Sequence, residues 1–262
     1  MTQFSVINPA TQEVVKSYDA ATDEQIEQAL ASAQKTYTEW ARTTTVAERA
    51  ALAQRLAELF DERKDELGEI INREMGKPLE QAVGEAEFSG AIVKAFADNA
   101  EKWLADEEIE VEDGLRSFVR HQGLGVILGI MPWNYPYYQV ARFAAPNIIL
   151  GNTVILKHAS QCPESALALE QLFLDAGFPE GAYVNVFASH DQLSTMIADD
   201  RVQGVSLTGS ERAGAIVAEQ AGRALKKCVL ELGGSDVFYV TDDVADLDAA
   251  VEYAVGGRME NT

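Results

Sequence analysis

The part of the chain that follows residue 124 alternates short apolar runs with segments whose apolar residues recur at helical spacing. Short apolar strands alternating with amphipathic helices are typical of a parallel sheet with helices on both faces. The sequence therefore predicts an α/β fold with a Rossmann-like core. The predicted strands are 125–130, 153–156, 183–187, 202–207, 228–230 and 237–240, and the predicted helices are 138–150, 164–176, 191–197 and 212–225.

The first hundred residues carry the start and stop signals of helices. Thr22 with Gln25, and Thr45 with Glu48, have the spacing of capping boxes. Gly76 can take the left-handed conformation that ends a third helix. We expect this part to form a mostly helical layer of the fold. The remaining predicted elements are strands 4–7 and 14–17 and a fourth helix over 79–104.

The stretch between this helical layer and the predicted sheet is first acidic and then strand-like. Residues 106–113 read DEEIEVED, and a charge run of this kind usually lies in solvent. We expect a solvated connection there. Residues 116–126 are typical of a strand with a bend or a hairpin, because glycines interrupt an extended pattern.

Composition narrows the class of protein. The 262 residues, 47% of them hydrophobic, suffice for a large core in one or two domains. A formal net charge of -21 opposes attraction to nucleic acid and anionic lipid, so neither is an expected partner. No secretion signal opens the sequence, and no apolar run approaches the roughly 20 residues of a membrane span. Two cysteines indicate neither a disulfide framework nor a metal site, and they favour a cytoplasmic location.

Polar residues follow the carboxyl ends of four predicted strands, where parallel sheets bind ligands. Because these ends meet at one edge of the sheet, we expect the polar groups to converge. The four segments are MPWNYP at 131–136, KHAS at 157–160, TGS at 208–210 and ELGG at 231–234.

The segment 202–221 is typical of a strand, a turn and a helix that together bind a phosphate. A helix N-terminus offers unpaired N–H groups and a partial positive charge. Ser210 adds a hydroxyl, and Gly209 lets a pyrophosphate approach the backbone. The spacing differs from G-x-G-x-x-G, so an ordinary strand-to-helix turn is an equal alternative from this segment alone.

Three of these residues have side chains suited to chemistry. Asn134 can donate to a developing oxyanion, although an asparagine in a turn more often bonds its local backbone. Glu231 follows an apolar run, and burial would raise its pKa toward that of a general base. The alternative for Glu231 is an ion pair with Lys226 or Lys227. Lys157 can bind ribose hydroxyls or a phosphate, or it can simply extend its ammonium to solvent.

The order and separation of these motifs resemble those of the aldehyde dehydrogenase superfamily. MPWNYP, LK with a small polar turn, LTGS and LELGG follow that family's order, as do NPAT near the N-terminus and REMGKP at 73–78. The similarity covers the whole chain, and within the superfamily it is greatest to succinate-semialdehyde dehydrogenases. It implies NAD(P)-dependent oxidation of an aldehyde through a cysteine thioester.

The resemblance assigns roles residue by residue. It implies that Asn134 is the oxyanion-hole amide and that Glu231 is the base that activates water to hydrolyse the thioester. It also implies that Trp133 and Lys157 line the adenosine end of the cofactor and that Ser210 meets its pyrophosphate. The implied cofactor-binding residues are Ile130, Met131, Pro132, Trp133, Lys157, Ala159, Ser160, Thr208, Gly209, Ser210, Val217 and, against the nicotinamide, Leu232 and Gly233.

Two further positions bear on substrate and cofactor. Arg142 stands where succinate-semialdehyde dehydrogenases are expected to carry an arginine that grips the distant carboxylate of the substrate. Its alternative is a helix-surface arginine. Ser160 falls where NAD-preferring relatives tend to have a glutamate, and a serine leaves room for a 2′-phosphate beside Lys157. The resemblance therefore implies NADP, with NAD as a second option, and a small aldehyde carrying a carboxylate.

The cysteine that the family's reaction needs closely follows a motif NTGQ, and the sequence stops at Asn261 and Thr262. Cys228 lies in the apolar run KKCVLEL and is predicted to be a buried strand residue. Cys162 precedes Pro163 at a predicted helix start on the adenosine side. The resemblance therefore implies that the nucleophile lies beyond this chain, together with the family's catalytic domain and C-terminal oligomerisation strand.

Two alternatives stay open. The chain can be a catalytically inactive NAD(P)-binding or assembly fragment that keeps Asn134 and Glu231 without using them. A plain Rossmann dehydrogenase would need a Tyr-x-x-x-Lys pair or a catalytic histidine, whereas His121, His158 and His190 are predicted to be surface or turn residues.

The family interpretation also divides the chain and predicts its assembly. Residues 1–113 would form the N-terminal helical part of the cofactor-binding domain, and 114–124 an oligomerisation strand segment. Residues 125–250 would form the dinucleotide-binding core and 251–262 the start of the catalytic domain. The whole protein is expected to be a homo-oligomer, either a dimer or a tetramer.

Overall fold

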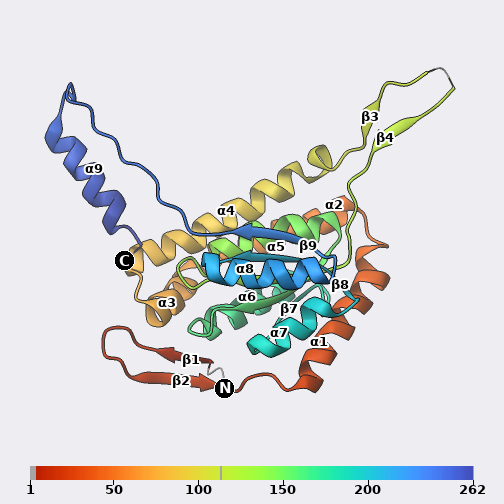
Figure 1. Ribbon diagram of the computed structural model, residues 1–262, viewed down its shortest axis with the longest axis horizontal. Helices are drawn as coiled ribbons and strands as arrows, with labels where there is room; N and C mark the ends of the chain where they lie inside the picture. The colour runs from red at the N-terminus through yellow and green to blue at the C-terminus, as the bar shows by residue number, and fades with distance from the viewer. Residues whose placement is uncertain (1–3, 113, 262) are drawn as a thin grey trace.

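The computed structural model describes residues 4–112 and 114–261, and within them five parallel strands form the central sheet (Figure 1). The strand order is β7–β6–β5–β8–β9, and every neighbouring pair is parallel. The predicted class, a Rossmann-like α/β fold, is confirmed. The strands are β5 (Val126–Met131), β6 (Thr153–His158), β7 (Tyr183–Asn185), β8 (Val202–Thr208) and β9 (Lys227–Glu231).

Helices cover both faces of the sheet, as predicted. On one face α2 to α6 pack around Ile127 and Leu156, and on the other α1, α7 and α8 pack around Leu128 and Ile155. The expectation of one N-terminal helical layer is therefore wrong for α1, whose apolar side lies on the opposite face. The helices are α1 (Asp23–Thr36), α2 (Val46–Glu62), α3 (Lys64–Met75), α4 (Leu79–Trp103), α5 (Tyr138–Leu150), α6 (Pro163–Asp175), α7 (His190–Ala198) and α8 (Glu211–Arg223).

Local signals explain where the N-terminal helices begin and end. Thr22 and Thr45 complete the predicted capping boxes of α1 and α2. Gly76, with φ of 81°, ends α3 in the left-handed conformation that favours glycine. The antiparallel hairpin of β1 (Phe4–Ile7) and β2 (Val14–Tyr18) confirms the predicted first strands. After α1 the chain continues into a π-helical turn, η1 (Tyr37–Ala41), which the sequence did not predict.

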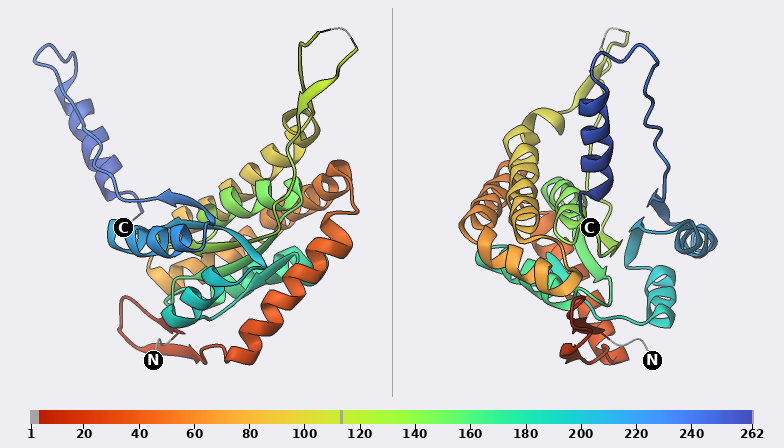
Figure 2. Two further views of the ribbon diagram at one scale, coloured as in Figure 1. Left: turned by 45° about the vertical axis from the view of Figure 1, so that its right-hand side comes forward. Right: turned by 90° about the vertical axis from the view of Figure 1, so that its left-hand side faces the viewer.

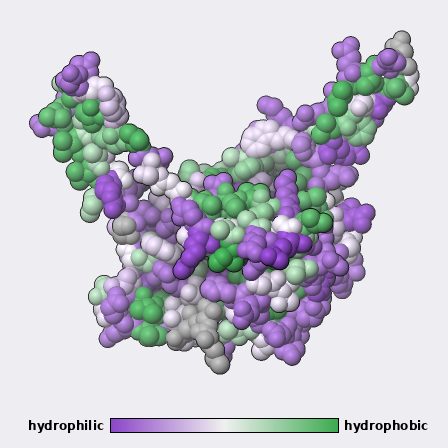
Figure 3. All heavy atoms as spheres, viewed as in Figure 1, coloured by the Kyte–Doolittle hydropathy of each residue, from purple (hydrophilic) through white to green (hydrophobic). Residues whose placement is uncertain are grey.

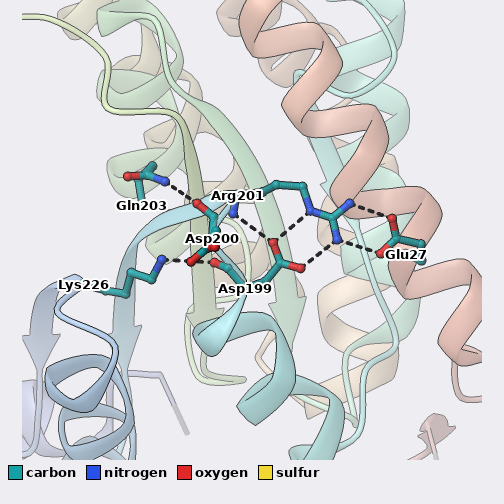
Figure 4. A network of polar contacts seen from close by, with 6 residues as sticks. All are labelled: Glu27, Asp199, Asp200, Arg201, Gln203 and Lys226. Carbon is teal, nitrogen blue, oxygen red and sulfur yellow. Dashed lines mark hydrogen bonds and ion pairs between the residues drawn. The ribbon is translucent and has the colours of Figure 1, made fainter.

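A polar network fastens α1 to the loop before β8, at the amino ends of the strands (Figure 4). The guanidinium of Arg201 donates to both carboxylate oxygens of Glu27 at 2.7 Å, and to both oxygens of Asp199. The Lys226 ammonium donates to the Asp199 carbonyl at 3.1 Å. Hydrogen bonds from Arg201 lower the pKa of both carboxyls, which stay charged and bound.

Two segments project from the body of the molecule (Figures 1 and 2). The first is an antiparallel hairpin of β3 (Glu107–Ile109) and β4 (Ser117–Val119). In the predicted solvated connection at 106–113, residues 107–112 are exposed and Asp106 is half-buried, but part of the segment is a strand rather than a loop. The strand pattern predicted over 116–126 yields only the short β4.

The second projection is the exposed segment after β9, which ends in α9 (Leu247–Met259). The predicted strand 237–240 is wrong, because no strand of the described residues lies beside it to accept its hydrogen bonds. Val237 is 86% exposed and α9 buries none of its residues. Figure 3 shows apolar side chains gathered on α9.

Candidate functional site

The carboxyl ends of four strands bring the predicted site residues to one edge of the sheet. Met131 at the end of β5 is in register with His158 at the end of β6, and Thr208 of β8 is in register with Glu231 of β9. The amide of Gly209 donates to the Glu231 carbonyl at 3.0 Å, which ties the last two turns together. The convergence expected from the sequence is confirmed.

The turn after β5 presents Trp133 and Asn134 at this edge. Trp133 is 45% exposed and Asn134 is half-buried. Within the described residues the Asn134 side chain makes no hydrogen bond, so the local backbone bond considered as its alternative is not present there. Its amide group is therefore available to donate to a ligand.

His158 joins the turn after β5 to the turn after β6. Its Nε2 lies 3.0 Å from the Pro136 carbonyl, and its Nδ1 accepts from the amide of Ala159 at 2.8 Å. These partners require a neutral ring with its proton on Nε2. Burial lowers the pKa of His158 to about 4, which keeps the ring neutral. The prediction of a surface or turn residue is wrong here, since His158 is buried as the last residue of β6.

The turn after β6 is supported from behind by Glu74 of α3. Its carboxylate accepts from the backbone amides of Glu164 and Ser165 at 2.5 and 3.1 Å, and from the Ser165 hydroxyl at 2.6 Å. Glu74 thus caps α6, whose own N-cap residue, Cys162, makes no side-chain cap. Burial raises the pKa of the Glu74 carboxyl to about 7.

Lys157 is a buried cation on this edge. It is 8% exposed, and burial lowers the pKa of its ammonium. Within the part of the chain that the structure describes, its Nζ has no hydrogen bond or ion pair, and the Phe4 ring centroid is 5.8 Å away. A buried ammonium without a counter-ion is costly, so the site suits an anionic group. Ser160 lies half-buried two positions after the Lys157–His158 pair.

The turn after β8 has the features of a phosphate site in outline. Ser210 caps α8, and its Oγ accepts from the amide of Ala213 at 3.3 Å. Its hydroxyl proton therefore stays free to donate. A Cβ at Gly214 would stand 2.5 Å from the Leu232 side chain, so this glycine lets the turn after β9 pack against α8. Val217 is buried on the inner side of the same helix.

Arg142 and Glu231 both line a hollow of about 660 Å³ on the face of the sheet that α5 covers. The Arg142 guanidinium lies 3.6 Å from the Glu231 carboxylate. The predictions for Glu231 need correction, because its side chain is 55% exposed and its partner is neither Lys226 nor Lys227. The reason is that β9 is the edge strand and no described element covers this side of it.

Neither cysteine is placed as a nucleophile. Cys162 is fully buried at the start of α6, where its thiol lies 3.9 Å from the Trp133 carbonyl and burial raises its pKa well above its usual value. Cys228 is half-buried rather than buried as predicted, because it lies on the edge strand. Its pKa is also raised by burial. Both thiols therefore lack the lowered pKa of a reactive cysteine.

The described residues include neither a metal-binding cluster nor a membrane-spanning helix. In residues 4–112 and 114–261, no three His, Cys, Asp or Glu side chains are grouped so that they could hold a metal ion. Over the same ranges, no helix has the length and apolar character needed to cross a membrane.

Sequence reasoning missed the buried polar side chains behind the turns, which are His158, Glu74, Lys77 and Glu85. For Glu74 and Lys77 a signal existed, since both belong to the REMGKP motif at 73–78. Glu85 lies in a regular helical pattern, so its burial depends on which helix packs against α4. That information comes only from the fold.

Known proteins resemble this chain over its whole length. The protein of Deinococcus radiodurans named succinate-semialdehyde dehydrogenase (NADP(+)) is 52% identical over 99% of this chain and 54% of its own length. A Synechocystis protein named probable succinate-semialdehyde dehydrogenase (NADP(+)) is 44% identical over 98% of this chain and 56% of its own length. The chain thus spans about half the length of the curated relatives it matches.

A solved structure and the family model indicate the same family as these relatives. The crystal structure of succinic semialdehyde dehydrogenase from Streptococcus pyogenes in complex with NADP+ has a TM-score of 0.94 and 42% identity. The alignment covers 98% of this chain and 56% of that one. The model of the aldehyde dehydrogenase family matches residues 1–262. The chain therefore belongs to the aldehyde dehydrogenase family.

Proposed function

We propose that this chain is the dinucleotide-binding part of an NADP-dependent enzyme that oxidises succinate semialdehyde to succinate. The observation that carries the proposal is the set of side chains at the carboxyl ends of the strands. Lys157 stands near the end of β6, and Glu231 ends β9 and pairs with Arg142. Asn134 lies in the turn after β5. Relatives named succinate-semialdehyde dehydrogenase (NADP(+)) support both the substrate and the cofactor. The alternative of an inactive nucleotide-binding fragment has no comparable support.

The proposed roles follow from the chemistry of each side chain. The Asn134 amide donates to the oxyanion that develops on the aldehyde oxygen. The Arg142 guanidinium binds the distant carboxylate of the substrate, which a planar fork can do with two hydrogen bonds. The Glu231 carboxylate accepts the proton of the attacking water. The nucleophile is a cysteine outside residues 1–262, since Cys162 and Cys228 are not activated.

Bound NADP would supply the acceptor for the hydride. The buried ammonium of Lys157 fits its 2′-phosphate, with the small Ser160 leaving room for that group. The N-terminus of α8 and the hydroxyl of Ser210 fit the pyrophosphate. The other residues of the proposed cofactor site are Ile130, Met131, Pro132, Ala159, Thr208, Gly209, Val217 and Gly233.

Calorimetric titration of this chain with NADP and with NAD tests the cofactor assignment. Ser160→Glu should weaken NADP binding by about tenfold or more, because a carboxylate repels the 2′-phosphate, while NAD binding changes little. Gln161→Glu adds the same charge at an exposed neighbouring position and should change both affinities less than about threefold. If Ser160→Glu affects both cofactors equally, Ser160 does not face the 2′ position.

The substrate assignment is tested in the whole protein. Arg142→Ala should raise the KM for succinate semialdehyde much more than the KM for an uncharged aldehyde of equal length, because only the first has a carboxylate to bind. Equal changes for the two substrates would remove the clamp role of Arg142.

We further propose that the whole protein acts as a homo-oligomer in the cytoplasm, with the divisions at residues 113, 124 and 250 predicted above. The β3–β4 hairpin supports an assembly role, because it extends from the body with the half-exposed apolar side chains of Phe118 and Val119. Sedimentation of the whole protein with and without residues 106–120 would test that role.

A further inference from the structure

A buried ion pair lies behind the turn that carries Asn134. Lys77 stands in the connection between α3 and α4, and Glu85 stands in the second turn of α4. Their side chains are each 1% exposed, and the Lys77 ammonium donates to Glu85 Oε2. Burial opposes the charge on both groups, while each partner favours the charge on the other. Such a pair is costly to bury, so its other contacts are informative.

Glu85 also binds the backbone of the turn after β5. Its Oε1 accepts from the amides of Tyr137 and Tyr138 at 2.9 and 3.2 Å. These amides open α5, which has no side-chain cap of its own at Tyr137. Glu85 therefore caps α5 from a different helix, with a charged acceptor at the positive end of the helix dipole.

Lys77 contacts the same turn from its other side. Its Nζ lies 3.9 Å from the centroid of the Tyr135 ring, close enough for a cation–π interaction. Tyr135 in turn packs edge-on against the ring of Tyr138 at 5.7 Å. The ion pair thus holds residues on both sides of Pro136, and Asn134 directly precedes the first of them.

We propose that Lys77 and Glu85 are positioning residues that fix the turn 133–137 and thereby aim the Asn134 amide at the site. Apolar side chains could fill the same space, but they could not accept the two amide hydrogens of α5. The orientation of the Asn134 amide matters for catalysis only if Asn134 has its proposed role. Whether Lys77 and Glu85 fix the turn 133–137 does not depend on that role, so it can be tested separately.

Hydrogen exchange of the wild-type chain gives the first test. The amides of Tyr137 and Tyr138 should be protected, because they donate to a buried carboxylate. Glu85→Ala should speed exchange over 133–138 by about tenfold or more and leave the amides of β5 unchanged, since only the turn loses its acceptor. Lys94→Met with Asp98→Asn removes an exposed ion pair from the same helix and should change neither region.

A rescue variant separates positioning from a merely structural role. Lys77→Met with Glu85→Gln removes both charges but keeps an oxygen that can accept from the two amides, so exchange over 133–138 should return to within about threefold of the wild type. Unprotected amides at Tyr137 and Tyr138 in the wild-type chain would overturn the proposal. So would exchange over 133–138 in the rescue variant that is about tenfold or more faster than in the wild type. Both of these results compare a variant with the wild type or use the wild type alone, so they decide even if Glu85→Ala does not fold.

Trp133 provides a second readout next to Asn134. The chain has three tryptophans, so its indole N–H resonances can be assigned by replacing Trp133 with Phe. Glu85→Ala should broaden or shift the Trp133 resonance, and those of Trp40 and Trp103 should stay in place. A shift of all three resonances would indicate a general loss of structure and would contradict the proposal.

The affinity for NADP tests whether the Lys77–Glu85 pair matters for the proposed function. Because Trp133 is expected to line the cofactor, Glu85→Ala should weaken NADP binding several-fold, roughly 1 kcal/mol, while the Lys94 and Asp98 control leaves it unchanged. If the wild-type chain fails to bind NADP, the proposed function fails. The exchange experiment would then still decide whether Lys77 and Glu85 hold the turn.

Discussion

The turns after β5 and β6 differ from the turn after β9 in what lies behind them. The first two rest on buried polar side chains, namely Glu85, His158 and Glu74, which bind their backbone amides and carbonyls. The turn after β9 and the segment up to α9 are exposed. Several contacts therefore hold the backbone next to Asn134, whereas the side chain of Glu231 is held by one ion pair, in which it is 55% exposed.

Disruption of the buried Lys77–Glu85 pair should have the largest effect on the free energy of unfolding. Lys77→Met leaves Glu85 without its counter-ion, and the free energy of unfolding should fall by about 3–5 kcal/mol. Lys94→Met disrupts an exposed pair on the same helix and should cost less than about 1 kcal/mol. Urea unfolding of both variants measures the difference. Equal losses would mean that the buried pair gives the turn no special support.

The free energy of unfolding should depend on pH through Glu74, which lies behind the turn after β6. The Glu74 pKa of about 7 in the folded chain lies above its ordinary 4.5, so the folded state binds the proton more tightly. Stability from this group is complete below about pH 4.5 and is lost as pH rises to about 7, a loss on the order of 3 kcal/mol.

Glu74→Gln isolates this effect, because an amide oxygen can still accept from the α6 backbone but does not titrate. The variant should gain stability relative to the wild type as pH rises from 5 to 7.5. Glu66→Gln, an exposed change on the same helix, should show no such trend. Thermal unfolding at several pH values measures it, and a constant difference for Glu74→Gln would show that the carboxyl does not titrate in this range.

The exposed ion pair of Arg142 and Glu231 should contribute far less to the free energy of unfolding. A double-mutant cycle with Arg142→Gln and Glu231→Gln should give a coupling energy below about 1 kcal/mol, because both side chains are in contact with solvent. A coupling above about 2 kcal/mol would place Glu231 among the firmly held residues.

The same contrast explains what the sequence could predict. Capping boxes at Thr22 and Thr45 and the C-cap at Gly76 are local, and the structure confirms all three. The alternation of strands and helices from 125 to 231 is confirmed because each element buries one apolar side on its neighbours.

Predictions failed where the answer depends on a neighbour in space. The pattern at 237–240 suits a strand, but a strand needs a partner, and none lies beside it in the described residues. Cys228 was expected to be buried and Glu231 partly buried because an apolar run precedes or includes them in the sequence, yet β9 is an edge strand and both are more exposed. His158 was expected to be a surface or turn residue, yet it is buried at the end of β6, where its Nε2 donates to the Pro136 carbonyl.

The smallest effect is expected in the segment after β9. Phe238 is 61% exposed, so Phe238→Ala should change the free energy of unfolding by less than about 0.5 kcal/mol. Phe173→Ala makes the same change at a buried site beneath the sheet and should cost about 3–5 kcal/mol. Urea unfolding compares the two variants. A loss above about 1 kcal/mol for Phe238→Ala would mean that this segment packs against the body in solution, and the contrast between the supported and the exposed turns would then disappear.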